Sequence, residues 1–263
     1  MCKVIGILSL KGGVGKTSTV ISLGDAISDF GKKVLLVDGN LSAPNLGLHL
    51  KIVEPRVTLH HVLGREANVV SSIHKFGNFD VIPASVFGSI SVNPFELRDK
   101  IKLLKRKYDF IVIDSSPSMN DETLAVMLAS DELIIVTTPD VPTLSMTLRA
   151  VKLAKRRNTP INGLVLNKVH NKDFELTLEE IENVSGVPVL AVIPYDIDIL
   201  KSLSNFSPYT SYRKNSKGSV EYRKLAGILV GEKYNPFSLR NFFQITPKRQ
   251  EINREIFYDR VFG

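Results

Sequence analysis

The sequence predicts a doubly wound α/β fold, in which a mainly parallel sheet carries helices on both faces. Two observations predict it. Short apolar runs rich in Val, Ile and Leu alternate with longer helical patterns along most of the chain. The apolar runs show no polar alternation, which is typical of strands buried on both faces. Strand–helix–strand repetition of this kind implies right-handed crossovers and parallel pairing.

The predicted strands share this continuous apolar character. In chain order they are VIGILSL (4–10), KVLLVD (33–38), DVIPAS (80–85), FIVIDS (110–115), ELIIVTT (132–138), INGLVLNK (161–168) and VPVLAVIP (187–194). The segments between them have helical patterns and provide the crossovers. The predicted helices are 16–29, 94–105, 121–130, 143–157, 177–185 and 219–230. The composition changes near Glu232, so we expect one domain over 1–232 and a C-terminal extension over 233–263.

Length and composition exclude several classes of protein. With 263 residues, 43% of them hydrophobic and 23% charged, the chain can bury a full core. No apolar stretch of about 18 residues occurs, so we predict no transmembrane helix. The N-terminus enters a strand pattern at once, so we expect no signal peptide. The one cysteine, Cys2, cannot form an internal disulfide, and we expect a cytoplasmic location. The net charge of +7 is compatible with attraction to polyanions and equally with an ordinary lysine-rich surface.

The strongest signal is a glycine-rich segment, KGGVGKT (11–17), between a predicted strand and a predicted helix. Its glycines allow a tight turn that points backbone N–H groups at a phosphate, and the start of the helix adds a partial positive charge. Lys16 supplies a point charge for the outer phosphates, and the Thr17 hydroxyl is a ligand for Mg²⁺. We disfavour the alternative, a strand–helix turn without a ligand. The predicted phosphate-binding residues are Gly12, Gly13, Val14, Gly15, Lys16, Thr17 and Ser18.

Two aspartates end predicted strands at the edge of the sheet where open α/β folds bind ligands. Asp114 ends FIVID, and Asp38 ends KVLLVD. Taken singly, each is as well explained by a solvated loop position. Beside a phosphate loop, each becomes a candidate to hold Mg²⁺, directly or through water. The predicted metal site is therefore Thr17, Asp38 and Asp114.

The lysine ahead of the first glycines, Lys11, gives the loop the deviant form found in the MinD/ParA ATPases, and the chain resembles this family over about residues 1–232. The resemblance also includes VDGN (37–40), IDSSP (113–117), VTTPDVP (136–142), LNK (166–168) and IPYD (193–196). It implies a P-loop NTPase fold of the SIMIBI type that binds ATP with Mg²⁺ and hydrolyses ATP to ADP and phosphate. It also implies a face-to-face homodimer with two nucleotides between the subunits.

The resemblance assigns roles to individual residues. Lys11 reaches the phosphates bound to the partner subunit, where a second cation stabilises developing charge as an arginine finger does. Asn167 reads adenine, because an amide can both donate and accept as the adenine edge requires. A strand-end turn is the alternative role for Asn167. Pro194 and Asp196 match the loop that closes over adenine.

The chain departs from the family at residue 40. The family usually has a second aspartate two residues after the first, placed to orient the attacking water, and here that position is Asn40. An amide can hydrogen-bond water but cannot accept a proton as a carboxylate can, and general-base help is worth about 10²–10⁴-fold where it operates. We therefore expect intact ATP binding, with hydrolysis that is slow or depends on an activating protein partner. The predicted catalytic residues are Lys11, Lys16, Asp38 and Asn40.

MinD-like proteins end in a short amphipathic helix that lies on the membrane, and the tail offers two candidates for it. Residues 236–245 place Leu239, Phe242 and Phe243 at helical spacing. Residues 251–262 place Ile252, Ile256, Phe257 and Val261 on one side, although acidic neighbours disfavour an anionic surface. The alternative is a tail helix that packs on the domain or on a partner protein.

We predict an ATP-dependent dimerising switch of MinD type that positions structures inside the cell, and that binds the inner face of the cell membrane where its tail docks. One alternative is a ParA-type ATPase that segregates DNA, with basic runs such as 102–107 and 152–157 on phosphates. Another is an ATP-sensing scaffold that hardly hydrolyses ATP, as Asn40 suggests. An iron–sulfur carrier is disfavoured, because Cys2 alone cannot ligate a bridging cluster.

Overall fold

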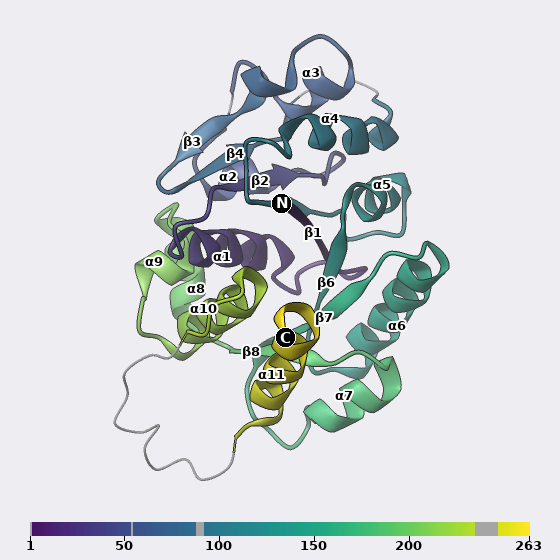
Figure 1. The fold of residues 1–263 in the computed structure, drawn as a ribbon, viewed down its shortest axis with the longest axis vertical. Helices are drawn as coiled ribbons and strands as arrows, with labels where there is room; N and C mark the ends of the chain where they lie inside the picture. Colours follow the sequence, from purple (N-terminus) through teal and green to yellow (C-terminus); the bar gives the residue numbers. More distant parts are fainter. Residues whose placement is uncertain (1, 54, 88–91, 235–246) are drawn as a thin grey trace.

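An eight-stranded sheet forms the centre of the computed structural model (Figure 1). The structure describes residues 2–53, 55–87, 92–234 and 247–263. The strand order is β3-β4-β2-β5-β1-β6-β7-β8, and all neighbours are parallel except β3 and β4. The strands are β1 (Lys3–Leu8), β2 (Val34–Asp38), β3 (His74–Phe76), β4 (Phe79–Ile82), β5 (Phe110–Asp114), β6 (Glu132–Thr137), β7 (Ile161–Val169) and β8 (Val189–Pro194).

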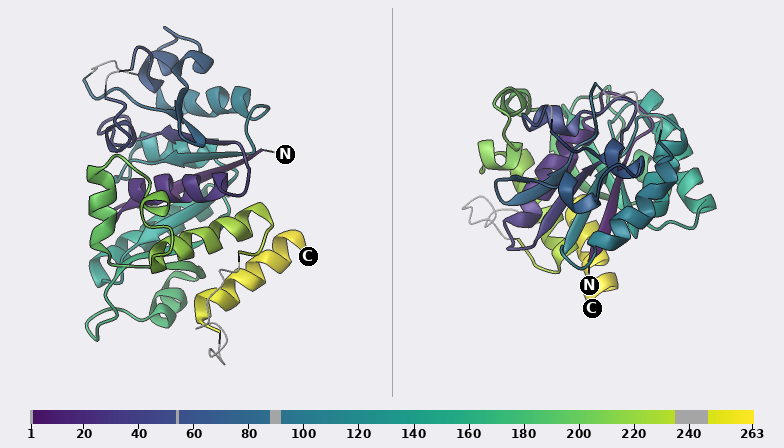
Figure 2. Two further views of the ribbon diagram at one scale, coloured as in Figure 1. Left: turned by 90° about the vertical axis from the view of Figure 1, so that its left-hand side faces the viewer. Right: turned by 90° about the horizontal axis from the view of Figure 1, so that it is seen from above.

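Helices cover both faces of the sheet, as the views in Figures 1 and 2 show. One apolar core joins the sheet to α1, α9, α10 and α11, and a second joins the other face to α3, α4, α5, α6 and α7. The helices are α1 (Lys16–Ser28), α2 (Leu46–His49), α3 (Leu59–Leu63), α4 (Leu97–Leu104), α5 (Asp121–Ala129), α6 (Val141–Arg156), α7 (Leu178–Ser185), α8 (Ile197–Ser204), α9 (Tyr209–Tyr212), α10 (Lys217–Val230) and α11 (Arg249–Phe262), with 3₁₀ turns η1 (Val69–Ser72) and η2 (Pro94–Glu96).

The central strands are buried on both sides. In β5, Ile111 and Ile113 enter the core under α4, α5 and α6, while Val112 enters the core under α1 and α10. Because successive side chains alternate between two covered faces, every position must be apolar. The prediction of a doubly wound, mainly parallel α/β sheet is therefore confirmed.

The predicted elements all occur, with ends that shift by a few residues. Sequence reasoning missed the edge strand β3 and the short helices α2, α3, α8 and α9. These elements are short, and most of them lie at the rim of the sheet, where neither a continuous apolar run nor a long helical period is required.

The C-terminal helix α11 packs on the domain. The ring of Phe257 is 2% exposed and lies in the core shared with α10. Arg254 is also buried, and its Nη1 donates to the Leu190 carbonyl of β8 at 2.8 Å and to Glu221 of α10 at 2.9 Å. Asn253 donates to the next β8 carbonyl, that of Val189, at 2.8 Å. The helix therefore covers the outer edge of the last strand, which would otherwise present unpaired backbone groups.

This packing agrees with one of the two alternatives given for the tail, a helix that packs on the domain. The four apolar residues expected on one side are divided, because Phe257 is buried while Ile256 is 62% exposed. The sequence alone does not show that β8 ends the sheet, so it could not decide which alternative applies. Residues 247–263 therefore pack as part of the domain rather than standing apart from it. The other candidate, 236–245, lies outside the described residues.

The strand order gathers the functional loops at one edge. β1 lies between β5 and β6, and β2 lies next to β5, so the loops that follow these strands meet. Asp38 and Asp114 occupy paired positions at the carboxyl ends of β2 and β5. Among the residues that the structure describes, none of the helices has the length and apolar character that crossing a bilayer would need.

Candidate functional site

The loop between β1 and α1 requires glycine at specific positions. Gly13 and Gly15 have φ angles of 78° and 90°, in the left-handed region. A Cβ on Gly15 would lie 2.3 Å from Nδ2 of Asn167, so no larger residue fits. Helix α1 begins at Lys16 with no side-chain cap and no acidic residue in its first turn. Its first N–H groups are therefore available to an anion.

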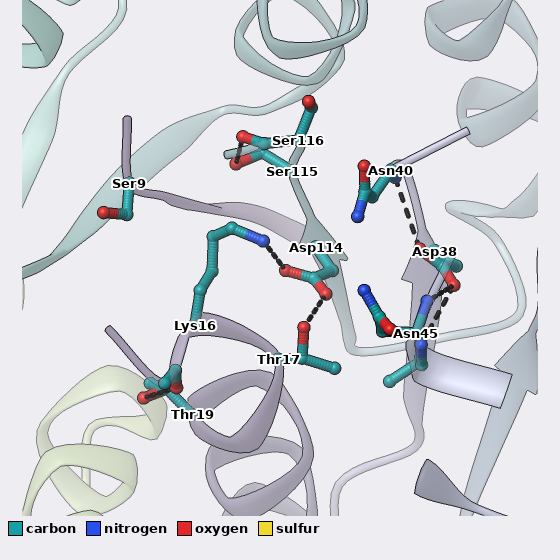
Figure 3. A network of polar contacts seen from close by, with 12 residues as sticks. Ser9, Lys16, Thr17, Thr19, Asp38, Asn40, Asn45, Asp114, Ser115 and Ser116 are labelled. Carbon is teal, nitrogen blue, oxygen red and sulfur yellow. Dashed lines mark hydrogen bonds and ion pairs between the residues drawn. The ribbon is translucent and has the colours of Figure 1, made fainter. Parts of the chain in front are cut away.

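Lys16, Thr17 and Asp114 form a buried cluster at the start of α1 (Figure 3). The Lys16 ammonium donates to Oδ1 of Asp114 at 2.7 Å, and the Thr17 hydroxyl donates to Oδ2 at 2.6 Å. Asp114 is fully buried and Lys16 nearly so. Taking both charges out of water is costly unless other groups compensate, so such a pair is more typical of a functional site than of a stabilising contact.

Asp38 lies beside this cluster, at the end of the neighbouring strand. Its Oδ2 accepts the backbone N–H groups of Asn45 at 3.1 Å and Leu46 at 3.0 Å, and its Oδ1 accepts that of Asn40 at 3.3 Å. Burial, and then the charge of Asp114, raise the pKa of Asp38 from 3.8 to about 7. A divalent cation at this edge would relieve the repulsion between the two carboxylates.

The two polar atoms of the Asn40 side chain differ in their hydrogen bonding. Nδ2 donates to the Ala43 carbonyl, whereas Oδ1 is buried without a hydrogen-bond partner in the described part of the chain. Asn40 is 3% exposed yet lines the cavity that lies beside the glycine loop. The free oxygen can accept a hydrogen bond from a water molecule but cannot hold its proton.

Lys11 is bound within its own subunit, at the start of α6. Its ammonium donates to Oδ1 of Asp140 at 3.1 Å and to the Thr143 hydroxyl at 2.7 Å. Partial burial acts in the opposite direction, but hydrogen bonds from Thr138, Thr143 and Lys11 lower the pKa of Asp140 to about 2. The Lys11 side chain is 40% exposed, so it is accessible from the face that carries the glycine loop.

Two residues at the end of β7 form hydrogen bonds with carbonyls of the glycine loop. Asn167 Nδ2 donates to the Val14 carbonyl at 2.7 Å, and Lys168 Nζ donates to the Gly13 carbonyl at 2.7 Å. The Oδ1 atom of Asn167 is buried and has no partner among the described residues. Asn167 therefore positions the loop with its nitrogen and leaves an acceptor for a ligand that carries an N–H group.

Asp196 shapes the entrance to α8. Its Oδ1 accepts the backbone N–H of Asp198 at 2.9 Å as the N-cap, and its Oδ2 accepts the Tyr209 hydroxyl at 2.6 Å. Because both oxygens are engaged, Asp196 fixes the loop that follows Pro194.

These elements enclose a cavity of about 530 Å³, a volume in the range of small-molecule and cofactor sites. Of the predicted site residues, those that line it are Lys11, Gly12, Gly13, Val14, Gly15, Lys16, Thr17, Ser18, Asn40, Asn167, Pro194 and Asp196. The structure thus brings together residues from four separate segments. Asp38 and Asp114 are fully buried and are not among the residues that line the cavity.

The sequence analysis did not identify several other residues that line the cavity. The cavity is also lined by Ser22, Asn45, His49, Pro117, Lys168, Tyr195, Ile199, Leu200, Leu203 and Tyr222. The N-cap aspartate before the pattern IDILKSLS is a signal that could have identified α8. No local pattern identifies Tyr222, whose hydroxyl lies 3.0 Å from that of Thr19 on α1, because the contact joins residues 203 apart.

The donor set fits Mg²⁺ together with a phosphorylated ligand. Hydroxyl and carboxylate oxygens are the ligands that this ion prefers, and it usually keeps several waters and phosphate oxygens. Within the described ranges, no group of three or more His, Cys, Asp and Glu side chains is arranged to hold a metal ion. The site therefore suits an ion that arrives with phosphates rather than one held by a protein cage.

Comparisons with known proteins agree with this geometry. A family model described as an AAA domain matches residues 2–161, and one described as an NUBPL iron-transfer P-loop NTPase matches residues 99–230. An uncharacterised ATP-binding protein of Methanocaldococcus jannaschii is 33% identical over 98% of this chain and 96% of its own.

Two solved structures are also similar. The cell division ATPase MinD of Pyrococcus furiosus is 39% identical, with a TM-score of 0.82 over 86% of this chain and 97% of its own. The septum site-determining protein MinD of Pyrococcus horikoshii, complexed with Mg-ADP, is 35% identical, with a TM-score of 0.83 over 87% and 96%.

Iron transfer is part of the description of the second family model and is not said of this chain. The sequence has one cysteine, and burial raises the pKa of the Cys2 thiol to about 11.

Proposed function

Because this chain belongs to the MinD/ParA family of P-loop ATPases, we propose that it is a dimerising ATP switch of MinD type. It binds Mg-ATP beside the glycine loop, pairs with a second copy and separates after hydrolysis. The observation that carries the proposal is the convergence of Lys16 and Thr17 on Asp114 at the uncapped start of α1. A cation, a hydroxyl and a carboxylate at that point are the groups that a triphosphate and its metal require.

Nucleotide binding rearranges the buried cluster. The outer phosphates replace Asp114 as the partner of the Lys16 ammonium, and the loop N–H groups donate to the phosphate oxygens. Thr17, Asp38 and Asp114 would be the residues that hold Mg²⁺. Bound Mg²⁺ neutralises charge that develops on the outer phosphates. Oδ1 of Asn167 accepts the exocyclic N–H of adenine.

Lys11 acts on the second subunit. Its ammonium is held by Asp140 and Thr143 on the exposed face rather than directed at its own Asp114 cluster, which supports a role in trans. Dimerisation exchanges these partners for the phosphates of the facing subunit. The exchange is favourable only when a triphosphate is present, so pairing depends on the nucleotide.

Hydrolysis is slow in the isolated protein. Asn40 can orient water through Oδ1 but cannot accept its proton, because its nitrogen is already bound to Ala43 and its oxygen is not basic. A partner protein that supplies or repositions a group at this point accelerates the reaction. This leaves the switch in its paired state until that partner arrives.

Sedimentation velocity with Mg²⁺ and a non-hydrolysable ATP analogue tests the proposal. The wild-type protein is expected to dimerise, Lys11→Ala to bind the analogue as a monomer, and Lys16→Ala to lose binding. Lys172→Ala is the matched control, because Lys172 is exposed and its side chain has no ion pair in the described part of the chain. A wild-type protein that binds no nucleotide, or a dimer that persists in Lys11→Ala, would refute it.

Turnover separates a switch from a scaffold. Asn40→Asp restores a carboxylate and should raise the hydrolysis rate about tenfold or more. An ordinary family rate in the wild-type protein without a partner would exclude the scaffold. No hydrolysis even with Asn40→Asp would instead favour it.

Co-sedimentation with anionic liposomes and with DNA, with and without ATP, tests the surface that the dimer binds. A MinD-type protein should bind liposomes, and Phe242→Asp with Phe243→Asp should abolish that binding. A ParA-type protein should bind DNA through α6, where Lys152 and Lys155 are exposed, and lose binding in the corresponding double glutamate variant. The run 102–107 is partly engaged already, since Lys105 pairs with Asp131 at 2.7 Å.

A further inference from the structure

A second cavity lies at the amino ends of the strands, at the opposite end of the sheet from the nucleotide site. Its volume is about 460 Å³, and Val34 and Phe79, the first residues of β2 and β4, form part of its wall. Val70 and Ile73, from η1 and the turn after it, add to the apolar surface. We call it the amino-edge pocket. It has a floor that favours an apolar side chain.

Three lysines from separate segments surround this floor: Lys33 precedes β2, Lys75 lies in β3, and Lys107 follows α4. All three are exposed, and within the described ranges none has an ion-pair or hydrogen-bond partner for its ammonium. Like charges gathered around one pocket repel one another unless an anion joins them. The three ammonium groups therefore lack an anionic partner among the described residues.

Two acidic groups lie nearby, and they are fewer than the three lysines. Asp80 lies directly across from Lys75 in the β3–β4 pairing, but its Oδ2 accepts the Tyr108 hydroxyl at 2.7 Å. Asp109, next along the chain, accepts the backbone N–H of Lys33 at 2.8 Å. Neither carboxylate forms an ion pair with the three lysines. The pocket thus keeps a surplus of positive charge over an apolar floor.

We propose that the amino-edge pocket binds an acidic peptide segment of a partner protein, with carboxylates at Lys33, Lys75 and Lys107 and one apolar side chain on the floor. A free inorganic anion would leave the apolar floor unused. Nucleic acid is disfavoured, because no arginine lines the pocket and Phe79, one of its two aromatic residues, is buried. A peptide can also use the outer backbone of β3, which is a terminal strand of the sheet.

The site is independent of the proposed nucleotide switch, because it shares no lining residue with the nucleotide cavity. A peptide bound here attaches the domain to a partner while the opposite edge remains free to pair with a second copy. The proposal therefore stands or falls separately from ATP binding.

Fluorescence anisotropy on the full chain tests the proposal with the fluorescein-labelled peptide EEFEE as the probe. The peptides EEGEE and KKFKK remove the apolar group and reverse the charge. Lys75→Glu with Lys107→Glu should weaken EEFEE binding at least about tenfold, since it replaces charge attraction at the rim with like-charge repulsion. Lys152→Glu with Lys155→Glu changes the same net charge on α6 and should leave binding unchanged.

A third variant tests the floor. Val70→Ser keeps every charge and should bring EEFEE down to the affinity of EEGEE; Val70 is 46% exposed, so the fold tolerates the change. NMR shifts caused by EEFEE should concentrate at 70–80 and 107–108. Equal weakening by both glutamate pairs, equal affinity for EEGEE in the wild-type protein, or a single-stranded DNA or tripolyphosphate that binds at this site in preference to EEFEE would each overturn the proposal.

Discussion

Replacing Asp38 by asparagine should stabilise the metal-free protein at alkaline pH, although it removes a predicted metal ligand. Asp38 is fully buried, pairs in register with Asp114 and has a pKa raised from 3.8 to about 7. A carboxylate whose pKa is raised on folding binds its proton more tightly in the folded state. The protonated Asp38 carboxyl therefore makes its full contribution to the free energy of unfolding below about pH 4, and this contribution is lost as the pH rises through about 7.

The magnitude follows from the shift. About three pKa units correspond to about 4 kcal/mol, which is the largest penalty that charging Asp38 imposes above pH 7. Asparagine removes the charge but turns an N–H donor toward one of the three backbone N–H groups that Asp38 now accepts, at a cost of about 1 kcal/mol. The expected gain in the free energy of unfolding is therefore about 3 kcal/mol at pH 8 and near zero or negative at pH 4.

Urea unfolding in EDTA at pH 4 and pH 8 measures this difference. Asp173→Asn is the matched control, since Asp173 is exposed and should show no gain at either pH. If Asp38→Asn were less stable than the wild type at pH 8, the three backbone hydrogen bonds would outweigh the buried charge, and the reasoning would be refuted.

Three further substitutions probe the loop, Lys11 and the tail. Asp140→Asn keeps the cap of α6 but weakens the hold on Lys11, so sedimentation with an ATP analogue should show dimers at roughly two- to fivefold lower protein concentration; a higher concentration requirement would mean that Asp140 aids pairing. Gly15→Ala should abolish binding of a fluorescent ATP analogue, whereas Gly31→Ala, also at positive φ but away from the loop, should cost about 1 kcal/mol of stability and leave binding intact. Phe257→Ala should lower the unfolding free energy by about 3–5 kcal/mol in thermal melts, while Ile256→Ala should change it by less than about 0.5 kcal/mol; similar effects would contradict the packing of α11.

The sequence predicts the sheet well because strands covered on both faces require a continuous apolar run, which is visible locally. Each central strand is a run of Val, Ile and Leu that needs no knowledge of its neighbours. The glycine loop is predictable for a related reason, since the left-handed backbone at Gly13 and Gly15 favours glycine locally. Asp38 and Asp114 follow from their place after strands.

Contacts between distant segments leave no such trace. The loops after β1 and β6 meet because β6 lies beside β1, so Lys11 finds Asp140 across 129 residues. The same holds for Asn167, whose bond to Val14 depends on β7 lying beyond β6. The tail is a further example: the amphipathic pattern of α11 is equally compatible with a membrane and with a strand edge, and its hydrogen bonds to β8 become visible only in the fold.

The two lysines of the loop suggest why the proposed switch needs both a nucleotide and a second copy. Lys16 is neutralised by buried Asp114, whereas Lys11 is neutralised by Asp140 on the exposed face. A phosphate must displace a buried carboxylate to reach Lys16, and that carboxylate is stabilised again only if a metal ion takes the place of the ammonium. Phosphate and Mg²⁺ should therefore bind together, and nucleotide without Mg²⁺ should bind weakly. Lys11 has no such requirement, since an exposed ion pair is worth little and exchanges readily. The replacement of Asp114 by phosphate at Lys16 is costly, so it sets the affinity for the nucleotide. The replacement of Asp140 by phosphate at Lys11 costs little, so dimerisation can follow whether a triphosphate is bound.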